Sequence, residues 1–365
     1  MQIAYPRYSV VTTAVNGNPV SPVPDTLKAL DPVMISGEIR DDSGNRMTGF
    51  NGTLFATVYD KASEIVTLGN DGETPLHFFL RKNIIYKGKT EVSAGEFSFS
   101  FIVPKDIAYQ YGSGRISYYA RSTETDANGF DEGIVVGGYS NNPVADTSGP
   151  VIRMFMNDTL FVNGGITDQN PVLLALVSDE SGINTVGNGI GHDITAILDD
   201  NTKDLLILND YYQSDLNTYK SGYIAYPFFG LSEGYHTLRL KVWDVYNNSS
   251  EAAIGFQVMP SSSLVMVDIF NYPNPFRYQT TFSFSYNHPN TSMDVSIDLY
   301  NMMGMRIRTL RRTVYTSGYR TNEITWDGTS DSGMIVGSGT YVYFLRITLP
   351  DGSSAYGHSK LIYSR

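Results

Sequence analysis

The stretch that decides the fold is Gly95-Glu-Phe-Ser-Phe-Ser-Phe-Ile-Val103, where apolar and polar residues alternate. In an extended strand successive side chains point to opposite faces, so the three phenylalanines share one face and the two serines share the other. This pattern is typical of an antiparallel strand that is buried on one side only. The segment therefore predicts a strand whose phenylalanines line a core.

The same period of two recurs along the whole chain of 365 residues. Further alternating segments are residues 33–39, 52–59, 114–120, 235–243 and 280–286. No stretch of helical length has a clear 3.6-residue period, and the composition is rich in tyrosine, with 26 Tyr against 2 Trp. Short strands between turn residues favour an all-β protein built of sandwiches or barrels.

Three proline-containing breaks divide the chain, at residues 18–25, 141–150 and 259–263. Proline lacks the N–H that an interior strand requires, so these breaks are expected to be linkers. We predict a strand or linker at residues 1–25, followed by β-sandwich domains at 26–145, 146–262 and 263–365. Their lengths fit three tandem immunoglobulin-like domains of about 100 residues each.

The composition excludes several classes of protein. The net charge of −11 argues against nucleic-acid binding, which needs a basic surface. The absence of cysteine removes disulfides, thiolate nucleophiles and cysteine-ligated zinc from this chain. No apolar run has the length of a membrane span, and no signal peptide is recognisable. We expect either an intracellular protein or a piece of a longer protein, and favour the piece.

Two acidic segments could bind a cation. Asp179, Glu180, His192 and Asp193 flank a glycine-rich stretch, and a calcium ion accepts such oxygen ligands. The favoured interpretation is nevertheless a glycine-shaped hairpin loop with a hydrogen-bonded His192. Residues 199–204 are expected to form a β-turn, where Asp and Asn side chains bind backbone donors. No cofactor is predicted, and a structural Ca²⁺ stays open.

No catalytic constellation stands out in the residues of this chain. The G-x-S-x-G elbow of α/β hydrolases is missing, as is the paired-histidine motif of metalloproteases. Nothing singles out a carboxylate pair for glycoside hydrolysis among 37 acidic residues. Aromatic residues at strand spacing are expected to lie mostly in the core and not to form a carbohydrate platform.

The last hundred residues carry an ordered set of motifs. These are FNYPNPF at 270–276, IDLYNMMGMRI at 297–307, WDGTSDSG at 326–333, GSGTYVYFL at 337–345 and KLI at 360–362. This block resembles the immunoglobulin-like domain of flagellar hook-capping proteins. In particular it is similar to the C-terminal domains that address proteins to the type IX secretion system. Trp326 is expected to plug one end of the sandwich.

The preceding blocks extend this resemblance. The motifs at residues 4–9, 36–39, 103–107, 179–183 and 236–249 resemble the region that follows the peptidase domain in gingipain-like cysteine peptidases, in particular type IX sortases. The resemblance implies a parent enzyme that removes the C-terminal signal of secreted cargo and joins the cargo to anionic lipopolysaccharide. Residues 1–25 would lead out of the peptidase domain. The catalytic Cys/His pair would lie upstream of Met1, so no catalytic residue is assigned here.

The resemblance also implies partners and a location. The parent would act at the bacterial cell surface, associated with the outer membrane, with the outer-membrane barrel protein PorV and other attachment-complex proteins. It would meet secreted cargo through the cargo's C-terminal domains, without contacting nucleic acid or spanning the membrane itself. We expect docking by main-chain pairing along an edge strand, with apolar anchors. The candidate residues are Asn271, Tyr272, Pro273, Asn274, Pro275, Phe276, Lys360, Leu361 and Ile362.

Two alternatives remain open at this point. The chain could form a substrate-recognition surface of a gingipain-like peptidase. It could also be a carbohydrate-binding module for an anionic polysaccharide, although its acidic charge would repel such a ligand.

Overall fold

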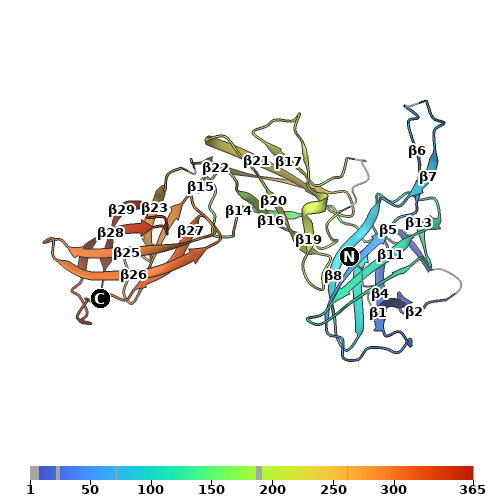
Figure 1. Ribbon diagram of the computed structural model, residues 1–365, viewed down its shortest axis with the longest axis horizontal. Helices are drawn as coiled ribbons and strands as arrows, with labels where there is room; N and C mark the ends of the chain where they lie inside the picture. The colour runs from blue at the N-terminus through green and yellow to red at the C-terminus, as the bar shows by residue number, and fades with distance from the viewer. Residues whose placement is uncertain (1–7, 22–24, 71, 186–190, 261, 365) are drawn as a thin grey trace.

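Strands are the main regular structure in the computed structural model, which describes residues 8–21, 25–70, 72–185, 191–260 and 262–364. Figure 1 shows three strand-rich bodies that follow one another along the long axis. Within the described residues the one helix is a 3₁₀ turn, η1 (Asn209–Tyr211), and no helix there is long and apolar enough to cross a membrane. The prediction of an all-β, immunoglobulin-like fold is confirmed. The expected glycine-rich loop, except Gly191, and the opening motif up to Arg7 lie outside the described residues.

The first body is a large curved sheet with a small sheet beside it. The large sheet has the order β8 (Ile84–Val92), β5 (Gly52–Tyr59), β11 (Arg115–Arg121), β12 (Asp126–Asp131), β1 (Tyr8–Val15), β4 (Pro32–Arg40), β9 (Glu96–Ile102), with β2 (Asn18–Pro19) paired to β1. The small sheet has the order β10 (Gly112–Ser113), β13 (Ile134–Tyr139), β3 (Asp25–Ala29).

The position of β1 differs from the expectation for residues 1–25. This strand pairs in parallel with β12 and in antiparallel with β4, so it lies inside the first sheet instead of leading up to it. Val10 and Val15 are buried in the same core as the later strands. The apolar alternation of β1 is therefore explained by burial in this domain.

The strand β9 behaves as its sequence predicts. Phe97, Phe99 and Phe101 are buried, while the serines between them are exposed. Tyr86 of β8 stacks on Phe101 with ring centroids 4.6 Å apart. Such aromatic pairs add to the stabilisation that burial of the rings already gives. The alternating segment is thus a central part of the first core.

A separate hairpin projects from the first body, as Figure 1 shows. It consists of β6 (Ser63–Val66) and β7 (His77–Leu80), which pair with each other alone among the described strands. Most of its apolar side chains are exposed, and the exposed fraction of Phe79 is 72%. A two-stranded hairpin without a further layer has little stability of its own in water.

The second body is a sandwich of two sheets. One sheet has the order β14 (Val151–Met156), β16 (Val172–Ser178), β20 (Ser221–Pro227), β19 (Tyr212–Ser214). The other has the order β15 (Ile166–Thr167), β22 (Ser249–Val258), β21 (Gly234–Trp243), β17 (Thr195–Leu198), β18 (Leu206–Ile207). Alternate residues of β16 and β21 point inward and are buried in a common core.

The third body is also a two-sheet sandwich. Its small sheet has the order β23 (Met266–Tyr272), β24 (Thr280–Tyr286), β27 (Arg320–Trp326). Its large sheet has the order β26 (Arg306–Thr316), β25 (Thr291–Asn301), β28 (Gly339–Thr348), β29 (Ser354–Tyr363). The core between them contains aromatic residues from both sheets, including Phe282 and Tyr343 in edge-to-face contact.

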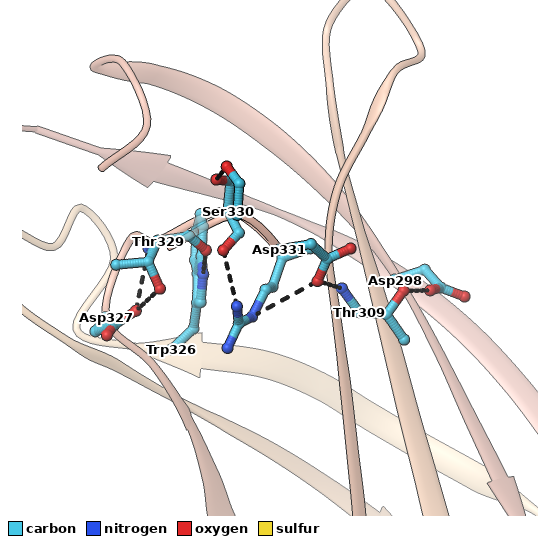
Figure 2. A network of polar contacts seen from close by, with 9 residues as sticks. Asp298, Thr309, Trp326, Asp327, Thr329, Ser330 and Asp331 are labelled. Carbon is cyan, nitrogen blue, oxygen red and sulfur yellow. Dashed lines mark hydrogen bonds and ion pairs between the residues drawn. The ribbon is translucent and has the colours of Figure 1, made fainter. Parts of the chain in front are cut away.

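A polar network closes one end of the third body around Trp326 (Figure 2). The Trp326 indole is buried, and its Nε1 donates to the Thr329 carbonyl at 2.8 Å. Nearby, the Asp331 carboxylate accepts from the Thr309 N–H, and the Asp298 carboxylate accepts from the Thr309 hydroxyl. Trp326 thus occupies the structural position that its motif indicates.

Candidate docking site

The segment after β23 runs along the C-terminal strand of the third body. Phe276 forms a parallel bridge with Tyr363. The Phe276 N–H donates to the Ile362 carbonyl at 3.0 Å, and the Ser364 N–H donates to the Phe276 carbonyl at 2.9 Å. Two segments that are far apart in the sequence, 271–276 and 360–362, therefore lie side by side.

Asn274 completes this pairing with its side chain. Its Nδ2 donates to the Lys360 carbonyl at 3.0 Å, and its Oδ1 accepts from the Ile362 N–H at 2.8 Å. The amide thus bonds to the donor and the acceptor that a neighbouring strand would use. The backbone edge of β29 at Lys360 and Ile362 is therefore already satisfied within the chain, so main-chain pairing with a partner would have to displace Asn274.

The nine candidate residues divide into buried and exposed groups. Phe276 and Leu361 belong to the core, and Asn271 is buried with its Nδ2 donating to the Thr280 hydroxyl at 2.8 Å. Phe276 and Leu361 are thus core residues and not surface anchors. The exposed members, which we name the docking patch, are Tyr272, Pro273, Asn274, Pro275, Lys360 and Ile362.

The docking patch combines exposed apolar groups with a fixed backbone. Tyr272 is 74% exposed and Ile362 is 41% exposed. The buried Thr280 hydroxyl donates to the Pro273 carbonyl at 2.8 Å, and this hydrogen bond holds the backbone of the docking patch in place. A rigid surface of this kind loses little conformational entropy when it binds.

The four residues proposed as a cation site are not brought together. The Glu180 carboxylate pairs with the exposed Lys220 ammonium at 2.7 Å. His192 Nδ1 contacts the Asp106 carboxylate of the first body at 2.8 Å. Burial raises the pKa of Asp193, and the charge of His192 partly offsets that effect.

Asp179 instead joins two aspartates that sequence reasoning missed. Carboxylate oxygens of Asp146, Asp179 and Asp244 lie within 4.8 Å of one another. Burial raises the pKa of Asp179 to about 6, with the charges of Asp244 and Asp146 adding to the effect. Three carboxylates could supply part of the roughly six to eight oxygens that Ca²⁺ prefers. Asp146 lies in the predicted linker at 141–150, and this position was the one feature of the sequence that pointed to it.

Residues 199–204 form the expected turn, with the Asn201 N–H donating to the Leu198 carbonyl. The Asp199 carboxylate forms an ion pair with a buried histidine of β21, His236. His236 Nδ1 lies 2.6 Å from the Asp199 carboxylate, and its Nε2 lies 2.8 Å from the Ser232 carbonyl. Both ring nitrogens thus face acceptors, which favours the protonated imidazolium. Burial alone would lower the pKa of His236, but these two hydrogen bonds outweigh burial and raise it.

A buried carboxylate joins the first body to the second. The Asp106 side chain is 6% exposed and accepts from Asn184 Nδ2 at 2.9 Å and from Asn247 Nδ2 at 2.8 Å, besides its contact with His192. Nearby, the Lys105 N–H donates to the Val245 carbonyl at 2.9 Å. Hydrogen bonds to a charged group are stronger than bonds between neutral groups.

A second contact lies on another side of the same junction. The Asn217 Oδ1 accepts from the Thr90 hydroxyl at 2.8 Å and from the Glu91 N–H at 2.7 Å. The Asn217 N–H donates to the Lys89 carbonyl at 3.0 Å. A single contact would let one body rotate against the other, but two separate contacts prevent this rotation. The first and second bodies are therefore joined in a defined orientation.

Tyr319 joins the second body to the third. This residue precedes β27, yet its ring packs into the core of the second body, where it contacts Phe161 edge-on. It is 1% exposed, and its hydroxyl donates to the Asp168 carboxylate at 2.8 Å. Asn157 Nδ2 adds a bond to the Ser317 carbonyl at 3.2 Å. A residue of one domain thus completes the core of its neighbour.

The chain is similar to several solved structures, among them one at substantial sequence identity. PorU from Porphyromonas gingivalis, crystallised as a latent dimer, is 32% identical over 100% of this chain, with a TM-score of 0.46. This chain spans about a third of that protein, covering 34% of it. No family model matches the chain, and no curated protein matches it.

Two adhesin structures match over a similar length but at low identity. One is a tetra-tandem repeat from the extending region of a large adhesion protein, at 10% identity over 98% of this chain and 74% of that one, with a TM-score of 0.20. The other comes from a bacterial ice-binding adhesin, at 10% identity over 98% of both chains, with a TM-score of 0.21. At this identity and TM-score, neither structure indicates the function of this chain.

The similarity to PorU extends over the whole chain at 32% sequence identity. It agrees with the all-β architecture and with the order of the type IX motifs. Over its whole length the chain is therefore similar to a third of PorU, which is consistent with the C-terminal region of such a protein.

Proposed function

We propose that this chain is the non-catalytic part of a cell-surface type IX sortase, which docks and orients a cysteine peptidase domain. The parent protein would cleave the C-terminal signals of cargo and attach the cargo to anionic lipopolysaccharide. Its Cys/His pair would lie in the part of a PorU-like protein that this chain does not span. The three domains would then hold the peptidase at a fixed place relative to the outer membrane.

The observation that carries this proposal is the direct joining of consecutive domains by buried side chains. Asp106 is surrounded by three side chains of the second body, and Tyr319 of the third body inserts into the second core. A flexible tether would need no such contacts, because domain interfaces within a chain are otherwise loose. A spacer that sets an orientation does need them at both of its junctions.

The docking patch supports a contact with an outer-membrane barrel protein such as PorV. Tyr272 and Ile362 are exposed on a backbone that Asn274 fixes in place. Aromatic residues in a rigid, partly apolar surface commonly contribute most of the affinity of an interface. We place the contact on these side chains, and not on main-chain pairing with β29.

The experiment is co-purification of the barrel protein with the parent protein from detergent-solubilised outer membranes. Deletion of residues 263–365 and the variant Tyr272→Ala/Ile362→Ser should both reduce recovery of the barrel protein strongly. Tyr315→Ala is the matched control, since Tyr315 is 60% exposed in the same domain but lies outside the docking patch. Its recovery should equal that of the wild type.

Unchanged recovery after the deletion would refute docking through the third domain. If recovery falls only with the deletion, the third domain docks through another surface. If Tyr272→Ala/Ile362→Ser keeps recovery but abolishes cargo processing, the docking patch recognises substrate and does not bind the barrel protein.

A further inference from the structure

A groove of about 750 Å³ crosses the outer face of the large sheet in the third body. Its lining comes from all four strands of that sheet. The face is turned away from the core, because Val295, Ile297 and Leu299 of β25 point inward, while the residues between them point outward. It is separate from the docking patch and from both domain junctions.

Two arginines flank the middle of this groove. Ser296 on β25 has Arg311 of β26 opposite it on one side and Arg346 of β28 on the other. The two arginine backbones are thus two strand spacings apart, or about 10 Å. The ion pairs of this domain use Arg308 and Arg320, and within the described chain neither Arg311 nor Arg346 lies within ion-pair distance of a carboxylate. Two strong donors therefore face the groove.

Two aspartates of β25 supply hydrogen-bond acceptors, one on each side of Ser296 along the strand. Asp294 and Asp298 each accept a hydrogen bond from a threonine hydroxyl of β26, at 2.7 and 2.6 Å, on one oxygen only. Their second oxygens can accept from a ligand. With Arg312, three arginines and two aspartates line the groove, so donors and acceptors lie together with a small excess of positive charge.

Aromatic rings border the same groove. Tyr356 is 67% exposed, with the Arg346 guanidinium 5.3 Å above its ring. Phe344 is 52% exposed, in edge contact with Tyr300. Both rings are thus available to a ligand on the outer face of the sheet. A guanidinium stacked on an aromatic ring is fixed in place, which makes it a pre-arranged donor.

From this arrangement we propose that the groove binds a segment of polysaccharide, with sugar rings stacked on Tyr356 and Phe344. Sugar hydroxyls both donate and accept, which matches the combination of arginine and aspartate. Because two carboxylates accompany the three arginines, the lining does not require a strongly acidic ligand. A peptide is a poorer fit, because β25 and β28 have both backbone edges paired within the sheet and offer no main-chain partners.

The test is affinity electrophoresis of the whole chain through gels that contain dextran, yeast mannan, xylan or polygalacturonate. The variant Arg346→Gln/Tyr356→Ala removes one stacked pair from the groove. Arg277→Gln/Tyr278→Ala is the matched control, because it removes a similar arginine–tyrosine pair, 5.6 Å apart, outside the groove. Unchanged thermal unfolding of both variants verifies that they fold.

We expect at least one polysaccharide to retard the wild type and the control. The groove variant should bind that polysaccharide about tenfold more weakly, as loss of a stacked ring and its cation implies. The proposal is overturned if none of the four gels retards the wild type, or if the groove variant is retarded equally. Binding of poly-glutamate with no retardation by any polysaccharide would assign the groove to an acidic peptide instead.

Discussion

At the scale of single residues, the structure shows charged groups whose contribution to the free energy of unfolding depends on pH. Asp179 is the clearest case, because burial raises its pKa to about 6 and Asp146 and Asp244 lie beside it. A carboxyl group with a raised pKa in the folded state adds stability as the pH falls through that value. At pH 7.5 the same group is charged and opposes folding.

Replacement of Asp179 by Asn should therefore raise the melting temperature at pH 7.5 in the presence of a chelator. The gain should be below about 1 kcal/mol, because the site is half-exposed and water screens the repulsion. It should shrink toward pH 4.5, where Asp179 is protonated in the folded state. Thermal unfolding at both pH values checks this, and a loss of stability for Asp179→Asn at pH 7.5 would contradict it.

His236 has the opposite charge but changes stability in the same direction. Its hydrogen bonds to Asp199 and to the Ser232 carbonyl outweigh burial and raise its pKa. The stabilisation is thus complete below the unfolded pKa of about 6.5 and is lost as the pH rises through the folded value. The variant Asp199→Asn should weaken this pH dependence above pH 6.5.

Denaturant unfolding between pH 6 and 9 measures that effect. Asp200→Asn is the control, because Asp200 is an exposed neighbour that pairs with Arg239 and not with His236. Its pH profile should follow the wild type. Equal slopes for wild type and Asp199→Asn would show that this pair does not set the dependence.

At the scale of elements, one side chain pairs with the Lys360 carbonyl and the Ile362 N–H at the edge of β29. Asn274 bonds the Lys360 carbonyl and the Ile362 N–H, so Asn274→Ala leaves both groups without these partners. We expect a loss of about 1–2 kcal/mol in the free energy of unfolding of the third domain. Hydrogen exchange at the Ile362 amide should become faster.

The control for this change is Asn322→Ala, which alters an exposed asparagine of β27 in the same domain. It should leave exchange at Ile362 and the free energy of unfolding within about 0.5 kcal/mol of wild type. If Asn274→Ala leaves Ile362 exchange unchanged, the edge is protected by something other than this amide.

Elements were more predictable from sequence than contacts between them. The alternation in residues 95–103 defines β9, since a period of two follows from strand geometry alone. The role of Asn274 could not be predicted, because its partners lie 86 and 88 residues away. The same holds for Asp146 and Asp244 around Asp179, because these three residues are far apart in the sequence and only the folded chain brings them together.

At the scale of the whole molecule, sequence breaks indicated linkers, but they gave no information about stiffness. Residues 141–150 contain prolines and polar residues typical of a loose connection, yet the Asp146 carboxylate contacts the Ser181 hydroxyl. Asp106 and Tyr319 look unremarkable in the sequence, and only the packed structure shows that they join neighbouring bodies. An orienting function depends on these few contacts more than on the sandwiches themselves.

The most direct test of the account is a distance measurement between the first two bodies by pulsed electron spin resonance. The chain has no cysteine, so Asp42→Cys/Lys203→Cys gives two unique labelling sites on exposed turns. We predict a narrow distance distribution, unchanged by the exposed-site control Glu124→Ala and clearly broadened by Asp106→Ala. A distribution that is already broad without Asp106→Ala would contradict the claim that these domains hold a fixed orientation.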